Sequence, residues 1–108
     1  MGMSKGDIVL IPFPFTDLSG NKLRPAVVLF TVESDVTVAF ITSKMKFSGN
    51  YDLKIKKSTE NALKVDSVLK VSKIATIDKG LVIGMLGILN VQEISEMNAK
   101  LNELFALK

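Results

Sequence analysis

Six short apolar stretches, each bounded by turn-forming residues, precede one amphipathic segment near the end of this 108-residue chain. Apolar runs between clusters of Gly, Pro, Asn, Asp and Ser are typical of β-strands, and here they predict strands at 7–13, 26–32, 36–43, 51–57, 67–77 and 81–89. Residues 72–73 break the alternation of the fifth strand and predict a bulge there. So many short strands in so short a chain favour a strongly bent antiparallel sheet that closes partly into a barrel.

The amphipathic segment predicts a C-terminal helix. Asn90 is a good N-cap, and Glu93 follows three residues later, as in a capping box. Six apolar residues then recur with helical spacing and are expected to pack on the core: Val91, Ile94, Met97, Leu101, Leu104 and Phe105. We therefore expect a mainly β fold with a C-terminal helix, in a single domain over residues 1–108.

The composition excludes several kinds of chemistry. The chain has no cysteine and no histidine, which excludes disulfides, thiolate metal sites, cysteine nucleophiles and histidine general bases. The carboxylates are scattered, so we expect neither a metal site nor a cofactor. No apolar run approaches the roughly 20 residues of a membrane span, and residues 1–6 carry no apolar signal core. We expect a cytoplasmic protein that does not bind membranes.

The positive charge is unevenly distributed. The formal net charge is +3, yet the stretch 44–57 holds only Asp52 against five lysines, which are Lys44, Lys46, Lys54, Lys56 and Lys57. A local excess of this kind is typical of a surface that binds nucleic acid, RNA or DNA. It is equally typical of a solvated strand edge, where lysine prevents edge-to-edge association.

Arg24 is the only arginine of the chain and precedes Pro25 at the start of the second expected strand. A guanidinium grips a phosphate through two parallel hydrogen bonds, whereas lysine acts as a mobile point charge. The alternative is an ordinary salt bridge to Asp7 or Asp17. A hairpin of strands 26–32 and 36–43 would bring Arg24 to the same end as Thr42 and Ser43. The alternative role of these two hydroxyls is strand-end capping.

Several short motifs, taken in order, resemble the PemK/MazF-like toxins of type II toxin–antitoxin systems. The first are GDIVL at 6–10, FPFTD at 13–17, Gly20 and RPAVV at 24–28. The later ones are ITS at 41–43, DSV at 66–68, TIDK at 76–79 and IGML at 83–86, before the terminal helix. The resemblance covers nearly the whole chain.

This resemblance implies a small SH3-like, CcdB-like barrel that acts as a homodimer. It implies metal-free cleavage of single-stranded RNA, often mRNA, in which the ribose 2′-oxygen attacks the phosphorus, and a cognate acidic antitoxin bound across the dimer groove. Arg24 and Thr42 match the family's catalytic positions, and Ser43 adjoins Thr42. The residues expected to contact RNA are Asn21, Lys22, Lys44, Lys46, Lys70 and Ser72.

The chain also departs from the family pattern. Some members carry an acidic-Gln-Ile-Arg run on the fifth strand, where this chain has Ser72 at the acidic position and Ala75 at the arginine position. The general base is therefore not identified, and Asp17 in the first loop is the candidate substitute. We expect a slow or narrowly specific ribonuclease. The alternatives are a non-catalytic RNA-binding member of the family and a gyrase poison of the CcdB type.

Overall fold

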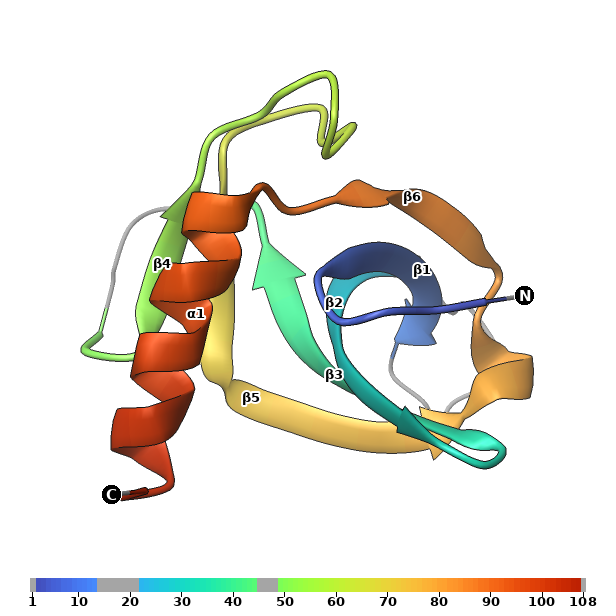
Figure 1. The fold of residues 1–108 in the computed structure, drawn as a ribbon. Helices are drawn as coiled ribbons and strands as arrows, with labels where there is room; N and C mark the ends of the chain where they lie inside the picture. The colour runs from blue at the N-terminus through green and yellow to red at the C-terminus, as the bar shows by residue number, and fades with distance from the viewer. Residues whose placement is uncertain (1, 14–21, 45–48, 108) are drawn as a thin grey trace.

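The computed structural model describes residues 2–13, 22–44 and 49–107, which form one six-stranded antiparallel sheet, a short 3-10 helix and an α-helix (Figure 1). The strands are β1 (Asp7–Phe13), β2 (Lys22–Val32), β3 (Asp35–Thr42), β4 (Asp52–Ile55), β5 (Ser67–Asp78) and β6 (Gly84–Ile88). The 3-10 helix η1 spans Lys79–Leu81, and the α-helix α1 spans Val91–Leu104. The strand order in the sheet is β4-β5-β3-β2-β1-β6.

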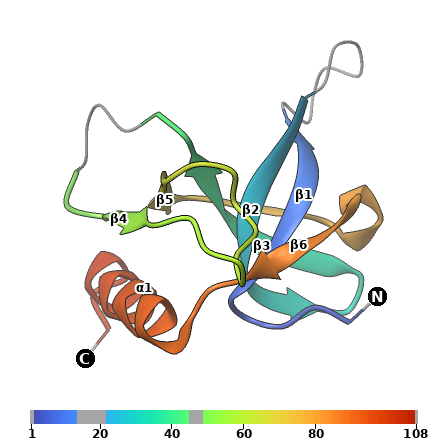
Figure 2. The same cartoon turned by 90° about the horizontal axis from the view of Figure 1, so that it is seen from above.

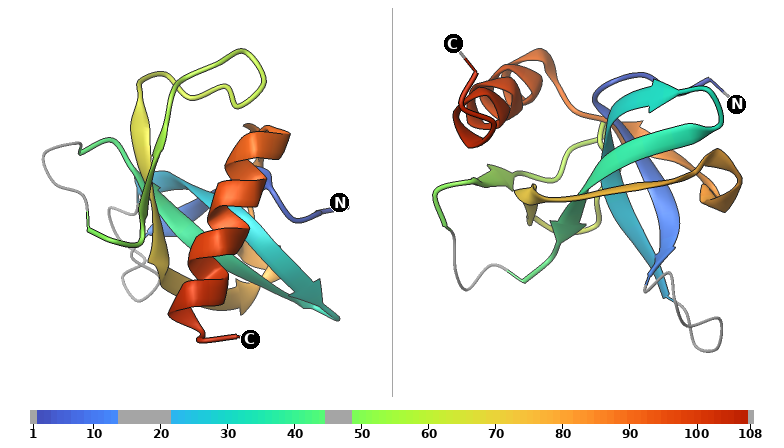
Figure 3. Two further views of the ribbon diagram at one scale, coloured as in Figure 1. Left: turned by 60° about the vertical axis from the view of Figure 1, so that its left-hand side comes forward. Right: turned by 90° about the horizontal axis from the view of Figure 1, so that it is seen from below.

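The expected fold class is confirmed: the chain is mainly β, with a partly open antiparallel barrel and a C-terminal helix. Every pair of neighbouring strands is antiparallel. The sheet curls strongly, and α1 lies against β4 and β5 at one end of it (Figures 2 and 3). Among the described residues, the one α-helix is too short and too polar to cross a membrane.

Apolar side chains are buried on both faces of the sheet, which explains why the strand segments are so continuously apolar. In β2, Val27 belongs to the cluster that also holds Met97 of α1, whereas its neighbours Ala26 and Val28 belong to a second cluster. Successive side chains of a strand point to opposite faces, so the two clusters lie on opposite sides of the sheet. Residues of both clusters border the candidate site.

The pairing of β3 with β5 is interrupted where the sequence predicted a bulge. Ala39 pairs with Ile74, but the next residue, Phe40, pairs with Lys70, so residues 71–73 have no counterpart on β3. Figure 1 shows β5 bending in this region. Extra residues in one strand bend it and change the direction of its side chains.

The predicted bounds of the second, fourth and last strands were wrong by two or more residues. The second strand begins at Lys22 and not at 26, because β1 continues to Phe13 and provides pairing partners; Arg24 pairs with Ile11 inside the sheet. The fourth strand spans Asp52–Ile55 and not 51–57. The last strand spans Gly84–Ile88 and not 81–89, since η1 occupies the start of that segment. Asp78 caps η1 by accepting a hydrogen bond from the Gly80 N–H, at 2.6 Å.

The capping box of α1 is confirmed. Asn90 Oδ1 accepts a hydrogen bond from the Glu93 N–H, at 2.7 Å, and Glu93 Oε1 accepts one from the Asn90 N–H, at 2.9 Å. The expected burial of six apolar side chains was wrong at the helix ends, where Val91 is 85% and Phe105 is 58% exposed. Only Met97 is fully buried, because the helix contacts β4 and β5 but extends beyond them.

Candidate nucleic-acid interface

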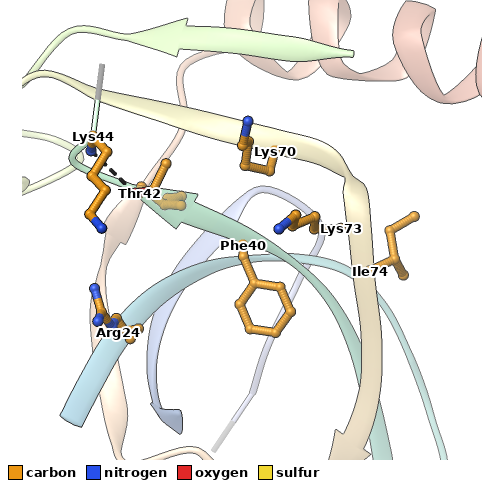
Figure 4. Close-up of a pocket in the computed structure, with 8 residues that line it drawn as sticks. Arg24, Phe40, Thr42, Lys44, Lys70, Lys73 and Ile74 are labelled. Atoms are coloured by element: carbon orange, nitrogen blue, oxygen red, sulfur yellow. Dashed lines mark hydrogen bonds between the residues drawn. The ribbon is translucent and has the colours of Figure 1, made fainter. Parts of the chain in front are cut away.

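A cavity of about 530 Å³ opens on the sheet beside residues of both apolar clusters (Figure 4). Strands β2, β3 and β5 provide its walls. It is lined by Arg24, Phe40, Ile41, Thr42, Lys44, Lys70, Lys73 and Ile74. Four of these eight residues are cationic and none is a carboxylate, so the cavity suits an anion.

Strand pairing brings Arg24 and Thr42 to this one cavity. Ala26 of β2 lies opposite Phe40 of β3, and Arg24 and Thr42 are each two residues further toward the same end of the hairpin. Because side chains alternate along a strand, both point to the face that Ala26 and Phe40 occupy. A single guanidinium and a single hydroxyl thus flank the same space.

The Thr42 hydroxyl has a defined hydrogen bond. Its Oγ1 accepts from the backbone N–H of Lys44, at 3.2 Å, just beyond the end of β3. A hydroxyl that accepts one hydrogen bond still has its own proton to donate. In Figure 4 the exposed side chains of Arg24 and Lys44 extend toward one another across this end of the cavity.

Lys70 is held by a carboxylate from the neighbouring strand. Its Nζ lies 2.8 Å from Oδ2 of Asp52, its pairing partner on β4, and the Asp52 side chain is only 5% exposed. Burial by itself raises the pKa of Asp52, but hydrogen bonds from Lys70 and the Gly49 N–H, with the charges of Lys70 and Lys100, hold it below its usual value. Part of the positive charge of Lys70 is therefore compensated before any ligand binds.

Ser43 does not share the cavity of Thr42. It lines a second cavity of about 350 Å³, which Arg24 also borders. Ser43 lies just beyond the end of β3 at Thr42, and Ile41 lines both cavities. The structure places Thr42 and Arg24 on one cavity and Ser43 and Arg24 on the other, so Arg24 borders both.

One wall of the second cavity is the segment that joins β4 to β5, which is held by hydrogen bonds of Asn61. Asn61 is only 1% exposed, and its Oδ1 accepts hydrogen bonds from the N–H groups of Ser58 and Leu63. Its Nδ2 donates to the Lys56 carbonyl, at 2.8 Å. These bonds fix residues 62–65, which line the cavity with mostly apolar side chains.

The other predicted RNA-contacting residues divide into two groups. Lys22 and Ser72 are exposed on β2 and β5, but they line neither of these two cavities. Asp17, Asn21 and Lys46 lie outside the described residues.

Arg24 does not form the salt bridge to Asp7 that was the alternative to phosphate binding. Asp7 is buried and accepts a hydrogen bond from the Ser4 N–H, at 2.7 Å. Among residues 2–13, 22–44 and 49–107, the ion pair found is the one between Lys70 and Asp52, and Arg24 forms none. Within the same ranges, no group of three or more acidic side chains is placed to hold a metal ion.

Four residues of the larger cavity were missed from the sequence as site residues, namely Phe40, Ile41, Lys73 and Ile74. All four were assigned only to strands. The predicted bulge at 72–73 was the available signal for Lys73, because it changes which face the following side chains occupy.

The sequence matches a known family over nearly its whole length. Residues 4–105 match the sequence model of the PemK-like, MazF-like toxins of type II toxin–antitoxin systems. A match over nearly the whole chain shows that the protein belongs to this toxin family. The comparison with curated protein sequences finds no significant match.

Solved structures share the fold at low sequence identity. A Mycobacterium tuberculosis toxin, MazF-mt6, is 20% identical, with a TM-score of 0.77 over 94% of this chain and 98% of its own. A mycobacterial endoribonuclease in complex with its cognate antitoxin is 13% identical, with a TM-score of 0.77 over 100% and 98%. A MazE–MazF structure from Deinococcus radiodurans is 18% identical, with a TM-score of 0.76 over 97% and 96%.

Proposed function

We propose that this chain is a toxin that cleaves single-stranded RNA without a metal ion, with Arg24 and Thr42 stabilising the scissile phosphate. The observation that carries this proposal is the shared cavity of Arg24 and Thr42, which lysines surround and no carboxylate lines. Family membership supports the toxin assignment.

The chemistry requires little of the protein beyond positioning and charge. The ribose 2′-oxygen attacks the adjacent phosphorus and displaces the 5′-oxygen, so the substrate provides its own nucleophile. Negative charge then grows on the phosphate oxygens. The Arg24 guanidinium can hold two of these oxygens, and the Thr42 hydroxyl can donate to one. Loss of one such donor costs about 2.7–4 kcal/mol of barrier in a comparable site.

The remaining cations suit flanking phosphates. Lys44 lines the same cavity and lies just beyond Thr42. Contacts of lysine with phosphates position a nucleic acid without reading its sequence. Selectivity between RNA sequences would then arise elsewhere, and the apolar second cavity beside Arg24 is a suitable place for an unstacked base.

We also propose a homodimer and an acidic antitoxin partner. Several large apolar side chains at one end of the sheet are exposed, namely Leu81, Ile83, Met85 and Ile88 on η1, β6 and the residues between them. An exposed apolar patch at a sheet edge favours a protein partner. Ile83→Lys is expected to shift the protein toward monomer in sedimentation, and Val91→Lys on α1 is the control.

Short acidic proteins from neighbouring reading frames are the antitoxin candidates to test for binding.

The test of activity is incubation of mixed RNA with the purified protein in EDTA, with the ends of the fragments mapped. The proposal expects fragments with a 2′,3′-cyclic phosphate and a 5′-hydroxyl. Arg24→Ala is expected to remove this cleavage and also growth arrest on induced expression. Equal arrest by the variant, or no cleavage by the wild type, would contradict the proposal.

A further inference from the structure

The register break in β5 brings a second lysine of this strand into the larger cavity. In a regular strand, residues three positions apart point to opposite faces of the sheet. Lys70 and Lys73 nevertheless line the same cavity. The cause is the break between Ala39 and Phe40, which leaves residues 71–73 without counterparts on β3. Bulges are common next to active sites, where they redirect a side chain.

The two lysines differ in what their ammonium groups face. In Figure 4 the Lys70 ammonium is directed toward β4, where it pairs with Asp52 at 2.8 Å. The Lys73 ammonium is directed toward the middle of the cavity, near Phe40. Lys73 is exposed, and within the part of the chain that the structure describes no carboxylate forms an ion pair with it.

Cleavage by the proposed route needs a proton donor, because the departing 5′-oxygen leaves as an alkoxide unless it is protonated. A guanidinium is not deprotonated in proteins, so Arg24 cannot supply the proton, whereas an ammonium can give one up. Ser72 and Ala75, on the same strand, carry no charge. Lys73 is the cation that this chain places between them.

Resting on the proposed function, we infer that Lys73 is the general acid of the cleavage reaction. The 2′-hydroxyl loses its proton to solvent water as its oxygen forms the new bond to phosphorus. The bond between phosphorus and the 5′-oxygen breaks, and its electron pair takes a proton from Lys73 Nζ. The products are a 2′,3′-cyclic phosphate and a 5′-hydroxyl, and Lys73 regains a proton from water.

The inference is tested with a substrate whose leaving group needs no proton. Once a cleavage site is mapped, an oligoribonucleotide is made with sulfur in place of the 5′-oxygen at that site. A thiolate is far less basic than an alkoxide and departs unprotonated. Single-turnover cleavage of the oxygen and sulfur substrates is then compared for the wild type, Lys73→Met, Lys73→Arg, Lys70→Met and the charge-matched control Lys5→Met.

We expect Lys73→Met to cleave the oxygen substrate about 10²–10⁴-fold more slowly and the sulfur substrate at nearly the wild-type rate. Lys73→Arg keeps the charge but not the donatable proton, so it should behave in the same way. Lys5→Met should match the wild type on both substrates.

Three results would overturn the inference: an unchanged rate for Lys73→Met, an equal loss on both substrates, or full activity of Lys73→Arg on oxygen. If Lys70→Met is the only variant that cleaves the oxygen substrate slowly and the sulfur substrate at nearly the wild-type rate, the general acid is Lys70 and not Lys73. These failures are distinguishable from failure of the proposed function, because in that case the wild type would cleave neither substrate.

Discussion

Lys70 and Asp52 face one another across β5 and β4, with Nζ 2.8 Å from Oδ2 at the border of the cationic cavity. The carboxylate also accepts a hydrogen bond from the Gly49 N–H, at 2.9 Å. This pair ties the edge strand β4 to the strand that carries the register break. It therefore contributes to stability and also fixes one wall of the site.

Asp52→Asn is expected to lower the free energy of unfolding at neutral pH by about 1–2 kcal/mol, because hydrogen bonds to a charged group are lost. The folded protein holds the pKa of Asp52 below its unfolded value. The stabilisation is therefore present above the unfolded pKa of about 3.9 and is lost as pH falls through the lower folded value. Urea unfolding from neutral to acidic pH measures the free energy of unfolding of the wild type and of Asp52→Asn. The difference between the two values should shrink as the pH falls below about 4. Exposed Glu96→Gln is the control, and a constant difference at all pH values would refute the assignment.

Gly87→Ala is expected to destabilise the protein by about 1–3 kcal/mol through overpacking. A Cβ at position 87 would lie 2.7 Å from the carbonyl carbon of Asn61, which is backbone and cannot rotate away. Gly84→Ala is the matched control on the same strand, since nothing lies within 4 Å of its Cβ position. Thermal and urea unfolding compare the two, and equal stability of both variants would contradict the close approach of β6 to the 60–61 backbone.

Thr42→Val and Ser43→Ala should differ sharply in their effect on RNA cleavage. Thr42 lines the larger cavity with Arg24 and three lysines, so loss of its hydroxyl should slow cleavage by about 10²–10³-fold. Thr42→Ser keeps the hydroxyl and should retain most activity. Ser43 lies in the second cavity, and its removal should slow cleavage of a preferred sequence by less than about threefold. Comparable losses from both hydroxyls would show that the two cavities act as one site.

Lys44→Met should weaken RNA binding by a similar factor for unrelated sequences, because lysine contacts to phosphate carry no sequence information. Removing one phosphate contact should also make the salt dependence shallower, by about 0.7 in the slope of log affinity against log salt concentration. Fluorescence titration with uncleavable 2′-deoxy oligonucleotides measures both quantities. An unchanged slope would remove Lys44 from the interface.

The sequence predicted the fold well because its strands and helix carry strong local signals. The capping residues Asn90 and Glu93 and the break at 72–73 were correctly interpreted. The start of β2 was missed, because pairing with β1, and not local composition, extends the strand through Pro25. The exposed ends of α1 were also missed, since periodicity shows a helical face but not how much of it the sheet covers.

The candidate site was predictable only in part. Arg24 and Thr42 could be placed together, because a hairpin fixes which ends of two strands meet. Ser43 was grouped with them by adjacency in sequence, but it lies beyond the end of β3 and lines the second cavity. Lys73 could be placed in the cavity only once the size of the register break was known. The pairing of Lys70 with Asp52 could be found only once the position of β4 was known. Both depend on long-range pairing that no local pattern encodes.

A double-mutant cycle between Arg24 and Thr42 tests the central claim most directly. Single-turnover RNA cleavage in EDTA is measured for the wild type, Arg24→Lys, Thr42→Val and the double variant. If both side chains hold one phosphate, the double variant should be little slower than the slower single variant, because residues that act as a unit are strongly non-additive. Two losses that multiply independently would contradict a shared phosphate site.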